Sequence, residues 1–433
     1  MLAMTYPQAI QFLYDLRLFG AKMGLENTLK LAGYSGNPQE KLRFIHVAGT
    51  NGKGSTCAMI ESIYRQSGLR VGLFTSPHLV SFAERIQVNR QLISEGDVAR
   101  LVDEMRDFLK NFPVEVHPTF FEVVTVMALK YFARQQCDLV ILETGMGGRL
   151  DATNIVTPLA SVITNVQFDH QQWLGNTLGQ IAAEKAGIIK PRVPVVTGTD
   201  DAQALEVIVS TAKAKAAPIT VVTSVEMQAA KAFDIPLLGD HQKQNAAVAM
   251  AVAGVLRGAL PVDDADVQRG IKQVQWAGRL QLVRREGGQT ILLDGAHNPA
   301  GAQTLLAALN SYFLGVRPAL ILGAMRDKDW PAICHILAPL ASKIHLCPTG
   351  SDRSADPQRL VGCCQEVNNV APIFVCSGLA EALKETESEP FTVVAGSLHL
   401  IGEAMELLHL SPAVAERGLN EWVRGDEIDR QVC

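Results

Sequence analysis

The segment from His46 to Thr56 constrains the fold more than any other part of this sequence. A glycine-rich loop, Gly49-Thr50-Asn51-Gly52-Lys53-Gly54-Ser55, lies between an apolar run that predicts a strand and one that predicts a helix. Glycines let the backbone wrap closely around phosphate oxygens, and a helix N-terminus adds partial positive charge. The order strand, glycine loop, lysine and helix therefore predicts a phosphate cradle for a nucleoside triphosphate.

This loop departs from the usual spacing G-x-x-x-x-G-K-[ST]. Val47 occupies the position of the first glycine, and Gly54 follows Lys53, so the hydroxyls come one residue later at Ser55 and Thr56. The alternative is a glycine turn with a surface lysine. The strand and helix on either side argue against that alternative.

Apolar runs that predict strands alternate with helical patterns along most of the 433 residues. Such alternation predicts an α/β fold with mainly parallel sheets. We expect two domains: residues 1–276, a P-loop ATPase domain, and residues 277–433, a Rossmann-like domain. The predicted strands are Phe44–Val47, Arg70–Phe74, Leu139–Glu143, Ala160–Thr164, Val193–Thr197, Ile291–Leu293, Ala319–Leu322, Lys343–Leu346 and Thr392–Ala395. The predicted helices include Glu95–Phe108, Phe120–Arg134, Asn176–Ala186 and Gln242–Val255.

Composition excludes several classes of partner. A net charge of −5 gives no reason to expect nucleic acid or an anionic membrane. The longest apolar candidate for a membrane span, Ala246–Leu256, is short and ends at Arg257. The eight cysteines form no C-x-x-C pair, which argues against a zinc ribbon and favours reduced thiols. We expect a soluble cytoplasmic protein, with a loosely held polar tail after Leu410.

Polar residues follow several predicted strands at their carboxyl ends, where parallel sheets bind ligands. Glu143 closes one strand, where it is either a natural metal ligand or a capping glutamate before a flexible loop. Ser76 either offers a hydroxyl to magnesium or simply precedes a proline turn. His170 is a candidate ligand through a neutral imidazole, although imidazole is unusual for magnesium. Lys185 lies near a helix C-terminus, where a lysine normally complements the helix dipole.

Three further positions each have two interpretations. Asn245 is either a polar residue in the first turn of a helix or an amide that contacts adenine. Asp294 either accepts from a ribose hydroxyl or caps the following helix. Asp151 either pairs with Arg149 at the surface or meets substrate.

Together and in order, these segments resemble the bacterial folylpolyglutamate synthase/dihydrofolate synthase family of the Mur ligase superfamily. The late segment Gly396–Leu400 also resembles a family motif, although His399 stands where tyrosine is more usual. The other matching segments, within about residues 20 to 400, are Gly-Thr-Asn-Gly-Lys-Gly-Ser, Thr-Ser-Pro-His-Leu, Phe-Glu, Glu-Thr-Gly-Met-Gly-Gly-Arg-Leu-Asp-Ala-Thr-Asn, Asp-His, Glu-Lys-Ala-Gly-Ile, Trp-Ala-Gly-Arg-Leu and Asp-Gly-Ala-His-Asn-Pro.

The resemblance implies an ATP-dependent amide ligase. A substrate carboxylate attacks the γ-phosphate of ATP to give an acyl phosphate, and the amine of L-glutamate then displaces phosphate. The expected acceptors are dihydropteroate and folate polyglutamates. The alternatives are a ligase for reduced folates only, another Mur-type amide ligase, and a nucleotide-dependent switch protein without ligase chemistry.

The resemblance also implies roles for individual residues. ATP is expected to contact Gly49, Thr50, Asn51, Gly52, Lys53, Gly54, Ser55, Asn245, Arg279 and Asp294. Two Mg²⁺ ions are expected on Ser76, Glu143, His170 and a carbamylated Lys185. The expected catalytic residues are Lys53, Lys185 and His297. The pterin is expected to contact Lys22, Met23, Gly24, Phe121, Glu122, Leu150, Asp151 and Ala152. We expect a monomer whose partners are small molecules.

Overall fold

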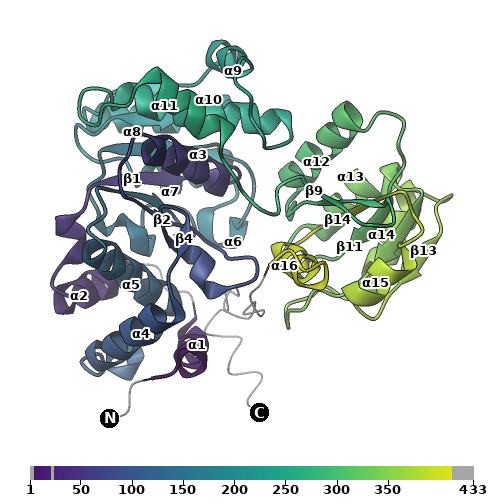
Figure 1. Cartoon of the computed structure of the whole chain (residues 1–433), viewed down its shortest axis with the longest axis horizontal. Coiled ribbons are helices and arrows are strands. Elements are labelled where there is room, and N and C mark those ends of the chain that lie inside the picture. Colours follow the sequence, from purple (N-terminus) through teal and green to yellow (C-terminus); the bar gives the residue numbers. More distant parts are fainter. Residues whose placement is uncertain (1–3, 21–23, 412–433) are drawn as a thin grey trace.

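The computed structural model describes residues 4–20 and 24–411. The chain forms two lobes, each built around its own sheet, and helices α12 (Pro299–Tyr312) and α16 (Leu398–Leu407) of the second lobe face the first (Figure 1). Both sheets are mainly parallel, so the predicted α/β fold is confirmed. Lys22, Met23 and the tail after residue 411 lie outside the described residues.

The first sheet has two antiparallel strands at one edge, and its other six strands are parallel. In spatial order its eight strands are β4 (Gln91–Leu92), β3 (Ile86–Val88), β2 (Val71–Phe74), β5 (Leu139–Glu143), β1 (Phe44–Ala48), β6 (Ala160–Ile163), β7 (Val195–Thr197) and β8 (Ile219–Val221). The central strands β1 and β5 are buried along their whole length. Helices cover both faces of the sheet, which explains why these strands read as continuous apolar runs.

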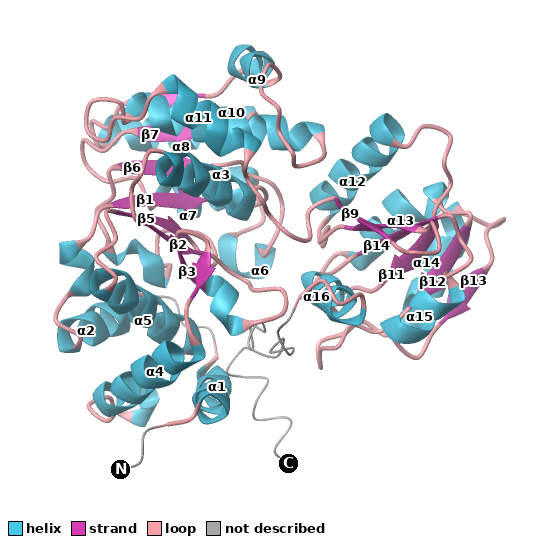
Figure 2. Ribbon diagram, in the orientation of Figure 1, coloured by secondary structure: helices cyan, strands magenta, loops and turns pink. Residues whose placement is uncertain are grey.

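Helices of the first lobe lie on both faces of its sheet (Figure 2). One face is covered by α1 (Tyr6–Asp15), α2 (Glu26–Tyr34), α4 (Glu95–Leu109) and α5 (Phe120–Arg134). The other carries α3 (Lys53–Gln66), α9 (Ser224–Ala230), α10 (Asp240–Val255) and α11 (Asp264–Lys272). A further apolar cluster joins the sheet to α6 (Gln171–Leu174), α7 (Leu178–Ala186) and α8 (Ala202–Ala214). The predicted helix Asn176–Ala186 begins at Leu178, because Thr177 caps it with its side chain.

The second sheet is parallel except for one edge strand. In spatial order its six strands are β13 (Ile373–Val375), β12 (Lys343–Leu346), β11 (Ala319–Leu322), β14 (Phe391–Ala395), β10 (Thr290–Leu293) and β9 (Gln281–Arg284). Its other helices are α13 (Trp330–Leu337), α14 (Pro357–Val367) and α15 (Leu379–Glu385). The predicted domain boundary at 276/277 lies in the connection between α11 and β9.

Five strands were not predicted from the sequence: β3, β4, β8, β9 and β13. Each lies at a sheet edge or next to one. β4, β8 and β9 are partly exposed and include polar residues, so they lack the continuous apolar run of a central strand. β13 is apolar but only three residues long, which is shorter than the runs that predict a strand.

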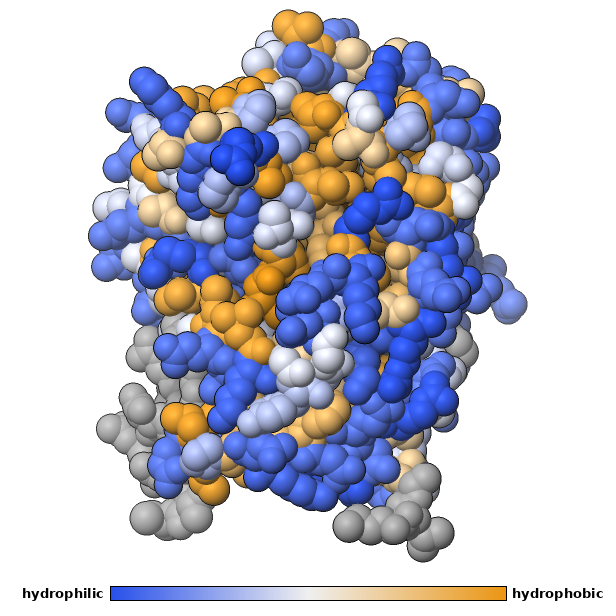
Figure 3. Space-filling view, turned by 90° about the vertical axis from the view of Figure 1, so that its left-hand side faces the viewer, coloured by the Kyte–Doolittle hydropathy of each residue, from blue (hydrophilic) through white to orange (hydrophobic). Residues whose placement is uncertain are grey.

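No helix in the described part of the chain is long and apolar enough to cross a membrane. The face of the first lobe turned away from the second is largely hydrophilic, with an apolar band across its middle (Figure 3). The seven cysteines within residues 4–411 are all free thiols.

Candidate active site at the cleft between the lobes

The predicted phosphate loop connects β1 to the first turn of α3. Gly52 has φ +81°, and a Cβ on it would lie 2.4 Å from Oδ1 of Asn245, so only glycine fits there. Lys53 begins α3, and its Nζ donates to the carbonyl oxygens of Gly49 (3.2 Å) and Thr50 (3.3 Å). Asn245 of α10 therefore lies directly against the loop, and the lysine holds the loop closed.

Asn51 connects the loop to its neighbours on both sides of the cleft. Its backbone N–H donates to Oδ1 of Asn165 (2.8 Å). Its side-chain amide donates to Oε1 of Gln167 (2.7 Å) and contacts the amide of Asn298, a second-lobe residue, at 3.2 to 3.3 Å. Asn51 thus links the phosphate loop directly to the second lobe.

A cavity of about 290 Å³ lies beside the loop and is lined by residues of both lobes. Every residue predicted to contact ATP, to ligate metal or to act in catalysis lines it: residues 49–55, Ser76, Glu143, His170, Lys185, Asn245, Arg279, Asp294 and His297. Positions separated by up to 248 residues in sequence are thereby brought into one place. A more open hollow of about 940 Å³ adjoins this cavity, and the two share Gln167, Asp169, His170, Asp327 and Lys328.

Two buried ionisable side chains in this cavity have few partners. The Glu143 carboxylate accepts a hydrogen bond from the backbone N–H of Ser76 (3.1 Å), and burial raises its pKa to about 7 against the lowering effect of Lys53. Burial, together with the Lys53 ammonium, lowers the pKa of Lys185 to about 7. No hydrogen bond to Nζ of Lys185 occurs among the described residues. A buried carboxylate and a buried, readily neutralised amine fit a site that receives a cation from outside.

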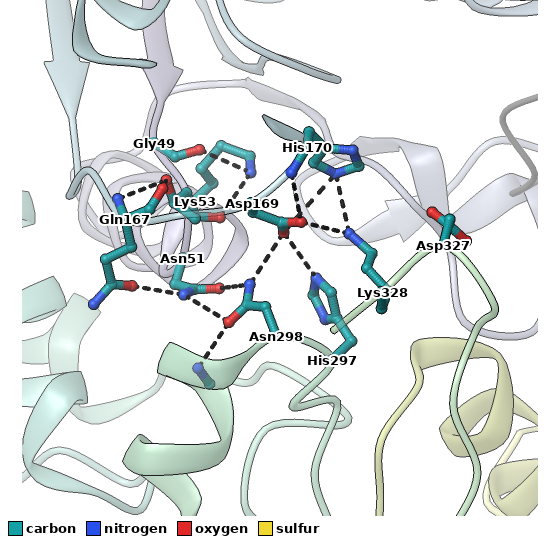
Figure 4. Close-up of polar contacts among 12 residues, drawn as sticks. Gly49, Asn51, Lys53, Gln167, Asp169, His170, His297, Asn298, Asp327 and Lys328 are labelled. Atoms are coloured by element: carbon teal, nitrogen blue, oxygen red, sulfur yellow. Dashed lines mark hydrogen bonds and ion pairs between the residues drawn. The ribbon is translucent and has the colours of Figure 1, made fainter. Parts of the chain in front are cut away.

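Asp169 is the point at which loops of the second lobe meet the first (Figure 4). Its carboxylate accepts from Nζ of Lys328 (2.6 Å) and from Nδ2 of Asn298 (3.1 Å), and Nε2 of His297 lies 3.7 Å away. Burial alone would raise the pKa of Asp169, but His297 and Lys328 hold it below its usual range. Asp169 is therefore an anion that is buried and paired.

His170 takes up a left-handed conformation, with φ 50°. Burial and the nearby Lys328 ammonium lower its pKa to about 3, so the ring is neutral, as the sequence analysis expected of a metal ligand. Its Nε2, however, lies 3.4 Å from Nζ of Lys328. A metal at this nitrogen would have to displace that lysine.

Asp169, Lys328 and Asn298 were not predicted as site residues from the sequence. Asn298 belongs to the motif Asp-Gly-Ala-His-Asn-Pro, which directly follows β10, and Asp169 precedes the predicted ligand His170. Lys328 follows β11 in the polar run from Arg326 to Asp329. The strand-end rule that marked Glu143 would have found Lys328 as well.

Asp294 anchors the connection between the lobes. Its two carboxylate oxygens accept from the backbone N–H groups of Leu280 and Ala296 (2.9 Å each), and burial raises its pKa. A Cβ on Gly295 would lie 2.2 Å from Nη1 of Arg279, so the guanidinium rests on this glycine. The helix-cap interpretation is wrong, because Asn298 is the N-cap of α12 and its Oδ1 accepts from the N–H of Gly301 (2.8 Å).

The described residues that were predicted to contact pterin lie elsewhere in the first lobe. Glu122 accepts from the N–H of Thr119 (2.8 Å) and from Oγ1 of Thr28 (3.3 Å), so it caps its own helix. Asp151 accepts from the N–H of Met146 (2.9 Å), and burial raises its pKa. A Cβ on Gly145 would meet the ring of Phe121 at 2.6 Å. Neither cavity wall described above includes Gly24, Phe121, Glu122, Leu150, Asp151 or Ala152, and their contact with pterin stays a prediction.

The fold and the cleft are those of a Mur-type ligase. Residues 47–253 match the Mur ligase middle domain, and residues 278–398 match the Mur ligase glutamate ligase domain. The chain is 37% identical over 365 residues to the dihydrofolate synthase/folylpolyglutamate synthase of Bacillus subtilis, an alignment that covers 79% of this chain and 84% of that protein. It therefore belongs to the folylpolyglutamate synthase/dihydrofolate synthase family of ATP-dependent acid–amino acid ligases.

Two further relatives extend this assignment. The chain is 36% identical to a probable bifunctional folylpolyglutamate synthase/dihydropteroate synthase of Haloferax volcanii, with 93% of this chain aligned, and it spans half the length of that protein (50%). The structure of E. coli FolC in complex with DHPP and ADP superposes with a TM-score of 0.82 at 28% identity, covering 94% of this chain and 98% of that one.

Proposed function

We propose that this ligase joins L-glutamate to dihydropteroate and to reduced folates, with ATP supplying the energy. The observation that carries the proposal is the single cavity in which the phosphate loop, Glu143 and Lys185 of the first lobe meet His297 of the second. The B. subtilis relative is named for both activities, and the E. coli complex holds DHPP with ADP. Residues 1–276 and 277–433 act as its two domains, and one chain supplies both walls of the cleft, so a monomer suffices.

The phosphate groups of ATP lie along residues 49–55, where the backbone N–H groups and the N-terminus of α3 face them. Lys53 releases the carbonyl oxygens of Gly49 and Thr50 and turns to the γ-phosphate, where its charge stabilises the transferring group. Asn245 and Arg279 contact the nucleotide from α10 and from the connection between the lobes. Asp294 contributes its free lone pairs to a ribose hydroxyl.

Glu143 with Ser76 would hold one Mg²⁺, and His170 with Glu143 and a modified Lys185 would hold a second. The residues fit because Glu143 is a buried carboxylate with a single backbone donor and Lys185 is a buried amine. A neutral Lys185 amine adds to carbon dioxide, loses a proton and becomes an anionic carbamate, which offers oxygen ligands. Bound Mg²⁺ would neutralise charge on the phosphates.

A pteroate or folate carboxylate then attacks the γ-phosphorus of ATP, the bond to the β–γ bridging oxygen breaks, and ADP leaves with formation of the acyl phosphate. The amine of L-glutamate attacks its carbonyl carbon, and inorganic phosphate leaves. His297 lines the second-lobe side of the cavity, close to the reacting groups. Its Nδ1 donates to the carbonyl oxygen of Gly295 (2.7 Å), which leaves Nε2 facing Asp169 and able to hold a proton there.

Phosphate release from Mg-ATP with L-glutamate tests this proposal, with dihydropteroate, tetrahydrofolate and a UDP-muramoyl peptide compared as acceptors. Turnover with both pteridines is expected. Turnover with tetrahydrofolate alone would reduce the activity to folate polyglutamylation. Turnover with the muramoyl peptide alone would contradict the proposal.

A further inference from the structure

Three side chains that can ligate a transition metal meet at the outer edge of the second sheet, on the far side from the cleft (Figures 1 and 2). His345 lies in β12, Cys376 directly follows β13, and Glu385 is the last residue of α15. The distance from Nδ1 of His345 to Oε2 of Glu385 is 3.1 Å. Sγ of Cys376 lies 3.8 Å from that nitrogen and 3.7 Å from that oxygen.

These three distances fit one face of a tetrahedron. Zinc bonds of about 2.0 Å to nitrogen or oxygen and about 2.3 Å to sulfur place tetrahedral ligands roughly 3.3 to 3.6 Å apart. The three edges in this structure lie within a few tenths of an ångström of that range. The three ligand atoms therefore surround a single point that an ion of this size can occupy.

The same geometry argues against a catalytic triad in which His345 activates the Cys376 thiol as a nucleophile. In a thiol–imidazole–carboxylate relay, the thiol and the carboxylate contact opposite ring nitrogens, but here both contact Nδ1 of His345. Burial and the neighbouring Glu385 carboxylate raise the pKa of Cys376 to about 12, the reverse of an activated thiol.

The surroundings favour ligation over incidental contact. The ring of Phe374 stacks on His345 with centroids 4.9 Å apart and planes inclined by 20°, which fixes the direction of Nδ1. His345 and Cys376 are buried, while the Glu385 side chain is 42% exposed, so the cluster is reached from solvent. One imidazole, one thiol and one carboxylate are a donor set that suits zinc.

We propose that His345, Cys376 and Glu385 bind one Zn²⁺, with water as the fourth ligand. The Cys376 thiol releases its proton to solvent on binding, whereas the neutral imidazole and the ionised carboxylate bind as they are. The ion would tie the edge strand β13 to β12 and to α15, and so stabilise the outer end of the second lobe. The ligands are separated by 31 and 9 positions, which is why no short metal motif is visible in the sequence.

The test uses the full-length protein stripped of metal and then titrated with Co²⁺ and with Zn²⁺ in excess Mg²⁺. The wild type is expected to bind one Zn²⁺ at this cluster and to give a thiolate-to-cobalt charge-transfer band. Cys376→Ala is expected to lose the band and at least about 100-fold in zinc affinity, because loss of a ligand costs at least as much as loss of an outer-shell partner. Cys363→Ser, which removes a half-buried thiol outside the cluster, is the matched control and keeps the band.

Glu385→Gln serves as a second variant, because the Glu385 side chain is 42% exposed and its replacement by an amide of the same size leaves the core packing unchanged. It retains the thiol and the ring, and zinc affinity is expected to fall at least about tenfold. Absence of the charge-transfer band in the wild type, or its persistence in Cys376→Ala, would show that the cluster is a hydrogen-bonded triad without metal.

Discussion

Nζ of Lys328 lies 2.6 Å from Oδ1 of Asp169, and this ion pair joins the two lobes across the cleft. The side chains are 12% and 9% exposed, so solvent screens the pair little. Asn298 and His297 of the second lobe approach the same carboxylate. The position of the second lobe over the phosphate loop is therefore coupled to a single buried charge of the first lobe.

Lys328→Met is expected to lower both turnover and stability. Removing one partner of a buried ion pair leaves the Asp169 charge uncompensated, which costs about 3 to 5 kcal/mol in the free energy of unfolding. The double variant Asp169→Asn/Lys328→Met should regain much of this stability without regaining turnover. Chemical denaturation and phosphate release measure the two effects.

The exposed ion pair between Arg257 and Asp264, at 2.6 Å, is the control for this prediction. Arg257→Met should change the free energy of unfolding by less than about 1 kcal/mol. Equal losses in the free energy of unfolding from Lys328→Met and Arg257→Met would contradict the prediction that the buried pair contributes more to stability than the exposed pair.

Gly52→Ala is expected to abolish ATP binding, because its Cβ would collide with the Asn245 side chain at 2.4 Å. Gly68→Ala is the matched control: Gly68 has nearly the same backbone, φ +86°, but open space around its Cβ position. Both variants share a strain of about 1 to 2 kcal/mol for a left-handed alanine. Isothermal titration with a non-hydrolysable ATP analogue should show loss of binding in Gly52→Ala alone, and equal affinities would argue against the collision.

Gly402→Ala is expected to loosen the contact between the lobes. Its Cβ would lie 2.0 Å from the carbonyl oxygen of Leu79, in the loop that follows Ser76. The next residue, Val80, is fully buried in the apolar core of the second lobe. Displacing this loop should lower turnover and raise the magnesium concentration needed for half-maximal rate, because Ser76 lies in the same loop.

Gly362→Ala in α14 is the control for that variant, since nothing lies near its Cβ position. It should leave turnover unchanged and stabilise the protein by up to about 1 kcal/mol through helix propensity. If Gly402→Ala reached its half-maximal rate at the same magnesium concentration as the wild type, the proposed coupling between α16 and the Ser76 loop would be wrong.

Lys185→Met is expected to abolish turnover and yet to stabilise the metal-free, bicarbonate-free protein. The pKa of Lys185 falls from 10.5 to about 7 on folding, so the native state binds fewer protons than the unfolded state between these values. Stability from this group therefore rises with pH from about 7 to about 10. The gain from Lys185→Met should be largest below pH 7 and fade towards pH 10, as thermal unfolding across this pH range would show.

Carbamate formation at Lys185 requires the deprotonated amine, because only the neutral amine attacks carbon dioxide. Occupancy should be high above pH 7 and fall below it, with turnover falling in parallel. Carbon-13 NMR with labelled bicarbonate would report the carbamate directly, with Lys185→Met as the blank. Full turnover without any carbamate signal would rule out this modification as a requirement.

Local features of the sequence were enough to predict the phosphate loop and the central strands. The loop from Gly49 to Ser55 is contiguous, and β1 and β5 are buried continuously, so their chemistry and burial are visible in consecutive residues. Glu143 was also found locally, as a carboxylate at the end of a strand. Edge strands such as β8 and β13 were not predicted, because each is only three residues long, and so short an apolar run does not distinguish a strand from a loop.

By itself, then, the sequence determined the α/β class, the phosphate loop and the family, since each depends on neighbouring residues or on ordered motifs. Only the tertiary structure decided that Asp169 pairs with Lys328, 159 residues away, and that His345, Cys376 and Glu385 converge at one edge of a sheet. The pKa values of Glu143 and Lys185 were also decided there. Burial and long-range pairing arise only when the lobes and strands pack together, and no local pattern of residues encodes the distance between two groups so far apart in the chain.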